Sequence, residues 1–192
     1  MADSTTLPGS ALSRTPDPLM VGMVVWLASE LMFFAGLFAA WFTLRANARQ
    51  WPPPGTELST GRTAVATAVL LASSFTMHLA VVGARRDDRR ASVRWLVVTV
   101  VMGAVFIANQ ALEYAQASFH IDTNAYGSTF YLMTGFHGLH VIGGLAFLLV
   151  IAGVVGGRSK APAERTVEMA AYYWHFVDVV WVAMFTVVYL LR

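Results

Sequence analysis

The sequence contains no cysteine, and only 12% of its 192 residues are charged. Without cysteine, the chain can form no disulfide, no thiolate metal site and no cysteine nucleophile. Soluble globular domains carry roughly 25% charged residues, so a soluble domain is disfavoured. The formal net charge of +2 is too small to indicate a nucleic-acid partner. What remains is a chain that is 57% hydrophobic, whose charges cluster between long uncharged stretches, as is typical of polytopic membrane proteins.

Five segments are long and apolar enough to cross a bilayer, since a spanning helix needs about 20 apolar residues. We therefore predict an all-α polytopic membrane bundle of five transmembrane helices. A polar tail, residues 1–18, precedes a single domain, residues 19–192, and the tail lacks the features of a cleaved signal peptide. The predicted helices cover approximately residues 19–45, 63–85, 94–115, 128–154 and 169–191.

The distribution of basic residues predicts how the bundle is oriented. The tail and the second and fourth connections hold nine of the thirteen Lys and Arg residues, and the opposite side holds four. Because connections rich in Lys and Arg stay in the cytoplasm, we expect a cytoplasmic N-terminus and an external C-terminus. The second connection, residues 85–94, is the most basic and can also meet anionic lipid. No internal repeat is present, which disfavours a secondary transporter.

Glu30 is the single charge within the first apolar run, residues 19–44. An ionisable group at that depth costs about 2.5–3.5 kcal/mol on insertion scales, so it needs a partner, a proton or a function. The residues alone leave three roles open: a proton-exchanging group, an ion or head-group ligand, and a protonated carboxyl bonded to a facing helix. Small residues recur beside it every seven positions and predict a face against a neighbouring helix. They are Gly22, Ser29, Gly36 and Thr43.

Polar residues also interrupt the later apolar segments, often in pairs spaced by three. That spacing places both members of a pair on one helical face. Such groups can form a metal site of a metal-dependent membrane enzyme, which we keep as an alternative, or a proton relay. Hydrogen bonds that order the bundle are the favoured interpretation. The residues concerned are His137 with His140, His175 with Asp178, and the single Glu113.

Several motifs resemble subunit III of the haem–copper cytochrome c oxidases. Residues 29–36, Ser-Glu-Leu-Met-Phe-Phe-Ala-Gly, resemble the Ser-Glu-x-x-Phe-Phe-x-Gly helix of that subunit. Residues 126–142 and 173–181 resemble its most distinctive stretch and its last helix. Residues 70–73 and 110–114 also match, in the same order along the chain.

The resemblance implies an accessory subunit of a proton-pumping terminal oxidase in a bacterial plasma membrane. Such a subunit has no catalytic residue and binds no metal, because haem and copper belong to partner subunits. It contacts subunit I above all, and also subunit II, other oxidase subunits and bound phospholipid, but no nucleic acid. It supports proton uptake and the stability of subunit I. The carbodiimide-reactive carboxylate of the family maps onto Glu30, and the residues expected to contact the bundle, lipid or a partner are His137, His140, His175, Asp178, Glu113 and Arg158.

The longer family form has seven helices, and this sequence predicts only the last five of them. Lipid sites lined by the first two helices are therefore not expected. Alanine- and valine-rich helices, and twelve Arg against one Lys, indicate a bacterium of high GC content. We expect an actinobacterial cytochrome c oxidase, which in that group couples to a cytochrome bc complex. Subunit III of a quinol oxidase is the alternative.

Overall fold

The computed structural model describes residues 18–157 and 162–191 of the chain. Within these ranges there is no strand, and every long helix is apolar and long enough to cross a membrane, so the prediction of an all-α bundle of five spanning helices is confirmed. The predicted tail up to residue 17 and Arg158 lie outside the described residues. The elements are α1 (Pro18–Asn47), α2 (Thr60–Arg85), α3 (Arg89–Gln116), α4 (Ala125–Gly156), α5 (Ala163–Phe185) and the π-helical turn η1 (Thr186–Leu190).

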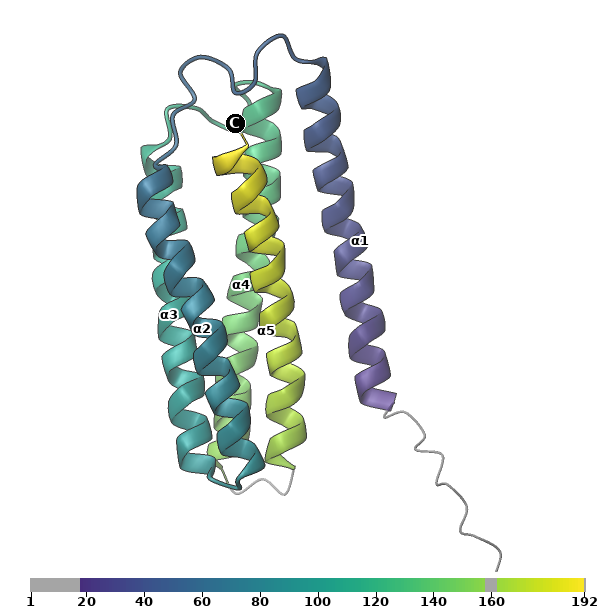
Figure 1. Cartoon of the computed structure of the whole chain (residues 1–192), viewed down its shortest axis with the longest axis vertical. Helices are drawn as coiled ribbons and strands as arrows, with labels where there is room; N and C mark the ends of the chain where they lie inside the picture. The colour runs from purple at the N-terminus through teal and green to yellow at the C-terminus, as the bar shows by residue number, and fades with distance from the viewer. Residues whose placement is uncertain (1–17, 158–161, 192) are drawn as a thin grey trace, which may run out of the picture.

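Four of the helices, α2 to α5, form a bundle, and α1 lies at its edge, as Figure 1 shows. The main contacts of α1 are with α4 and α5. Its buried side chains are Phe34 and Trp41, which lie seven residues apart and so on one face. The Trp41 ring packs against Trp51 in the connection to α2 and against Tyr126 of α4. Large aromatic rings therefore attach α1 to the bundle.

The small residues of α1 do not pack against another helix of this chain, contrary to the expectation from their spacing. Gly22, Ser29, Gly36 and Thr43 are all exposed. No atom lies within 4 Å of the position where a Cβ on Gly22 or Gly36 would stand. Aromatic side chains bury far more apolar surface than glycine or serine. They decide which face of α1 turns toward the bundle.

Glycines allow α3 and α4 to approach the buried Trp174 of α5. A Cβ on Gly103 of α3 would stand 2.7 Å from the Trp174 ring. A Cβ on Gly144 of α4 would stand 3.2 Å from the same ring. A larger residue at either position would require the neighbouring side chains or the helices to shift, so these glycines permit the close packing of the bundle centre.

Two indole groups tie α5 to α2. The Nε1–H group of Trp174 donates to the Ser73 hydroxyl at 2.9 Å. One heptad further along, Trp181 donates to the Thr67 hydroxyl at the same distance. Both bonds are buried, where an unpaired indole N–H would be costly.

All five helices begin earlier than the sequence suggested, and α3 and α5 do so by at least five residues. α3 begins at Arg89 rather than at residue 94, because the Asp88 side chain caps it by accepting the Ala91 N–H. α5 begins at Ala163 rather than at residue 169, directly after Pro162. Both first turns contain charged residues, which an apolar span does not include.

Candidate functional site

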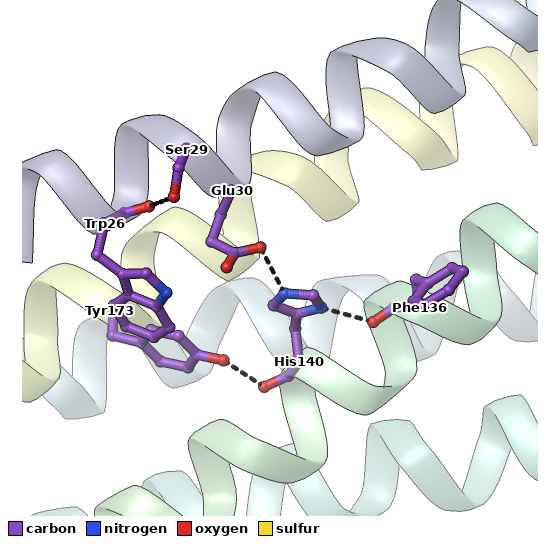
Figure 2. Close-up of polar contacts among 6 residues, drawn as sticks. All are labelled: Trp26, Ser29, Glu30, Phe136, His140 and Tyr173. Carbon is purple, nitrogen blue, oxygen red and sulfur yellow. Dashed lines mark hydrogen bonds and ion pairs between the residues drawn. The ribbon is translucent and has the colours of Figure 1, made fainter.

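Glu30 faces α4, where its carboxyl meets His140. The Oε2 atom of Glu30 lies 3.1 Å from the Nε2 atom of His140. Figure 2 shows the two side chains meeting between their helices. The side chains are 23% and 18% exposed, respectively, so the pair is partly open to its surroundings. Glu30 therefore has a titratable partner inside the apolar part of the bundle.

The other ring nitrogen of His140 determines how many protons the pair holds. Nδ1 lies 2.7 Å from the Phe136 carbonyl oxygen, which can only accept, so Nδ1 carries a hydrogen. Nε2 is then either an acceptor from a protonated Glu30 or, in imidazolium, a donor to the Glu30 carboxylate. Both arrangements place one proton between the two groups and leave the pair with no net charge. Moving that proton needs no movement of heavy atoms.

Neighbouring side chains hold this pair where three helices meet. The Tyr173 hydroxyl of α5 donates to the His140 carbonyl oxygen at 2.9 Å. Trp26 of α1 stacks on the Tyr173 ring, with centroids 5.3 Å apart and planes inclined by 5°. The Ser29 hydroxyl donates to the Trp26 carbonyl within α1, as Figure 2 also shows. The Phe34 ring packs edge-on against His140 at 5.1 Å.

His137 shares a helix with His140 but points into the bundle. It is buried and stacks on Trp181 of α5 with ring centroids 5.0 Å apart. Phe106 of α3 and Phe34 of α1 meet it edge-on. Neither ring nitrogen has a hydrogen-bond partner within the described part of the chain. His137 and His140 thus both contact Phe34. The ring nitrogens of His140 contact Glu30 and the Phe136 carbonyl, whereas those of His137 face the apolar interior of the bundle.

His175 and Asp178 are joined through a residue that the sequence reasoning missed. Ser74 of α2 lies with its hydroxyl oxygen 3.0 Å from the His175 Nδ1 atom, and it is also hydrogen-bonded to Asp178 Oδ2. Asp178 is 3% exposed, and its other oxygen, Oδ1, has no partner among residues 18–157 and 162–191. The sequence did contain a signal for Ser74, because two adjacent hydroxyl residues, Ser73 and Ser74, lie inside an apolar helix and need hydrogen-bond partners.

The buried Glu113 forms an ion pair with a partly exposed arginine and so ties α3 to the beginning of α2. Its Oε2 atom accepts from Arg62 Nη2 at 2.6 Å, and its Oε1 atom accepts from the Ser59 backbone N–H at 2.8 Å. Arg62 was not singled out from the sequence, although it lies near the start of a spanning segment where a buried carboxylate would need a cation. These contacts give Glu113 a structural role at the end of the bundle opposite Arg85.

The structure does not gather the predicted polar residues into one cluster. They are divided among the α1–α4 contact, the bundle interior, the α2–α5 contact and the end of α3. Among the described residues, no group of three or more His, Asp or Glu side chains is placed to hold a metal ion. The geometry therefore offers no support for the alternative of a metal-dependent enzyme, and it shows instead separate polar contacts between helices.

Comparison with known proteins identifies the family. The family model described as cytochrome c oxidase subunit III matches residues 1–192. A Mycobacterium tuberculosis protein named probable cytochrome c oxidase subunit 3 is 52% identical, over 92% of this chain and 90% of the relative. The Nocardia farcinica protein of the same name is 45% identical over the full length of both.

A protein named cytochrome c oxidase subunit 3 from Thermostichus vulcanus is 42% identical, over 92% of this chain and 89% of the relative. The relatives thus match this chain over most of their own length and include actinobacterial proteins. The resemblance read from the motifs is confirmed. This chain belongs to the cytochrome c oxidase subunit III family, whose members are subunits of an oxidase complex.

Proposed function

We propose that this chain is the accessory subunit III of a proton-pumping cytochrome c oxidase in a bacterial plasma membrane. It packs against subunit I, together with subunit II and the other oxidase subunits, and it supports proton uptake and the stability of subunit I during turnover. It contributes no catalytic residue and no redox centre, since oxygen reduction takes place at the haem and copper of its partner. The observation that carries this proposal is the contact of 3.1 Å between the Glu30 carboxyl and the His140 imidazole.

The position of the pair suits proton exchange with a neighbouring subunit. Its Glu30 lies on α1, whose most apolar 18-residue stretch is only 6% buried within this chain. The rest of that helix is open to lipid or to partner helices. A partly open, net-neutral pair can pass one proton to a neighbouring subunit as it accepts another, and it is then neutral before and after the exchange. Glu30 is therefore the titratable group that we assign to the accessory role.

Bound phospholipid is the second part of the proposal. Arg90 and Arg94 of α3 line a cleft beside Gly156 of α4, at the end of the bundle that the charge distribution places in the cytoplasm. Clustered arginines at a membrane surface attract anionic head groups. We extend the proposal to a supercomplex of this oxidase with a cytochrome bc complex, as expected for an actinobacterial oxidase.

The proton role is tested by the variant Glu30→Gln in the whole oxidase reconstituted into vesicles. Glutamine keeps the size and polarity of the side chain but cannot exchange a proton, so fewer protons should be pumped per electron. The matched control is Glu57→Gln, because Glu57 is an exposed carboxyl in the connection between α1 and α2. Equal pumping by both variants and the unmodified oxidase would show that Glu30 has no such role.

Subunit III of a quinol oxidase remains the second candidate, and the names of the relatives favour cytochrome c. The oxidase purified in mild detergent should show haem bands in its optical spectrum and should oxidise reduced cytochrome c. Oxidation of a quinol with no oxidation of cytochrome c would establish the alternative.

A further inference from the structure

A second polar region lies between α2 and α5, away from Glu30. A cleft of about 150 Å³ opens between these helices, and its lining includes His78, Arg85, Glu168, Tyr172 and His175. A water molecule takes up about 30 Å³ of liquid volume, so the cleft has room for several. At one side, Arg85 Nε donates to Glu168 Oε1 at 2.9 Å. This end of the helices therefore offers an opening into the bundle that is lined by polar side chains and has room for water.

His175 connects the cleft to the interior. Its ring lines the cleft, and its Nδ1 atom lies 3.0 Å from the Ser74 hydroxyl oxygen. Within the described ranges no hydrogen bond is formed by its Nε2 atom. One side of the imidazole is thus free to bind water while the other is bonded to Ser74. An imidazole that accepts a proton on one nitrogen can release the proton of the other.

Ser74 carries the connection to Asp178. A hydroxyl has one hydrogen and two lone pairs, so Ser74 can accept from His175 N–H while it donates to the Asp178 carboxylate. It can equally accept from a protonated Asp178 while it donates to His175. The change from one arrangement to the other reverses both hydrogen bonds and moves only protons. The Oδ1 atom of the buried Asp178 has no hydrogen-bond partner among the described residues, so the helix packing alone does not satisfy the hydrogen-bonding capacity of this carboxyl.

We propose that Asp178 is a buried proton-binding site that is loaded from the α2–α5 cleft through His175 and Ser74. A proton carried by water binds His175 Nε2, and the hydrogen on Nδ1 passes to the Ser74 oxygen. The original Ser74 hydrogen then passes to Asp178 Oδ2. One proton leaves the water and one arrives on the carboxylate, while His175 and Ser74 end neutral. The hydrogen of His175 then resides on Nε2, and the reverse transfers restore the first tautomer: Asp178 returns a proton to Ser74, Ser74 gives its hydrogen to Nδ1, and Nε2 releases its proton to water.

The groups that face this route come from both helices. Among the described residues, α2 contributes His78 and Arg85, and α5 contributes Glu164, Glu168 and Tyr172. Both acidic residues pair with Arg85, so these three side chains together carry a formal charge of −1 at the opening. This inference is independent of the role proposed for Glu30, because the two sites share no residue and lie on different helix contacts.

Infrared spectroscopy of the purified oxidase tests the proposal. A protonated Asp178 gives a carboxyl C=O stretching band, which is identified as the band lost in the Asp178→Asn variant. Transfer into D₂O shifts this band, and the rate of the shift measures proton exchange. Ser74→Ala should slow the exchange by about tenfold or more, which corresponds to a barrier increase of about 1.4 kcal/mol. Should Asp178→Asn not assemble, Asp178→Glu identifies the band by moving it.

Ser73→Ala is the matched control, because Ser73 is the adjacent hydroxyl and bonds to Trp174 of the same helix α5. It should leave the exchange rate unchanged, and Ser74→Thr, which keeps a hydroxyl, should restore the rate lost in Ser74→Ala. The proposal is overturned by any of three results. These are no carboxyl band assignable to Asp178, an exchange rate in Ser74→Ala equal to that of the unmodified protein, or equal slowing by Ser73→Ala.

Discussion

Glu30 shows how an ionisable residue can be kept inside an apolar helix. An isolated charge would cost about 2.5–3.5 kcal/mol or more at that depth. Here the charge has a partner, His140, and the pair is neutral in either proton arrangement. The hydrogen bond from Nδ1 to the Phe136 carbonyl orients the imidazole so that Nε2 meets the carboxyl. The cost is thereby reduced, and a movable proton is retained.

A double-mutant cycle on Glu30 and His140 measures how strongly they are coupled. We expect Glu30→Gln and His140→Gln to show a coupling of about 0.6–2 kcal/mol in the free energy of unfolding in detergent, the range of side-chain hydrogen bonds in membrane proteins. Glu57→Gln combined with His140→Gln serves as the control and should be additive. Additive effects within about 0.5 kcal/mol for the Glu30 and His140 pair would show that they do not interact.

Sequence reasoning at this scale identified residues that need partners but could not identify the partners. Spacing along one helix places Glu30 on a face, yet which residue of which other helix lies opposite depends on how each helix is rotated in the bundle. The same limit explains why Ser74 and Arg62 were missed. Their roles arise from contacts with residues more than fifty positions away in the chain.

At the scale of the helices, α1 is the least firmly attached of the five spanning helices. Its buried residues are Phe34 and Trp41, and its other contacts include the Glu30–His140 pair and the Trp26–Tyr173 stack. Long apolar segments predict that such a helix exists. They do not predict which face is covered, because lipid and protein are both apolar. The small-residue stripe therefore gave the wrong face for contacts within this chain.

Removing the Trp41 side chain tests the aromatic attachment of α1. Trp41→Ala should lower the free energy of unfolding of the subunit in detergent by about 3–5 kcal/mol, because a fully buried indole is replaced by a cavity. Phe42→Ala is the matched control, since the adjacent Phe42 is 46% exposed and should change stability by roughly 0.5 kcal/mol or less. Similar losses from the two variants would mean that Trp41 is not the anchor.

For the whole molecule, the number of spanning helices could be predicted from the sequence. Charged connections divide the chain into five apolar segments, each long enough to cross a membrane. The orientation across the membrane stays a prediction from the excess of Lys and Arg on one side. The connections after α2 and after α3 lie at opposite ends of the bundle, as Figure 1 shows. Each end can therefore be marked separately.

The absence of cysteine makes the orientation easy to measure. In intact cells, a membrane-impermeant maleimide should label Asp122→Cys, in the connection after α3, and should not label Arg86→Cys, directly after α2. Both residues are exposed, so burial does not explain a difference. Labelling of both variants after the membrane is permeabilised is the control. The opposite pattern in intact cells would place the N-terminus outside.

The number of turnovers that the oxidase completes before it loses activity tests most directly whether the Glu30–His140 proton serves the complex. Oxidase carrying Glu30→Gln should inactivate after fewer turnovers than the unmodified enzyme, because the shared proton is lost while the shape of the site is kept. Oxidase carrying Glu57→Gln should last as long as the unmodified enzyme. An unchanged lifetime for Glu30→Gln, in an oxidase shown to retain this subunit, would contradict the role proposed for the pair.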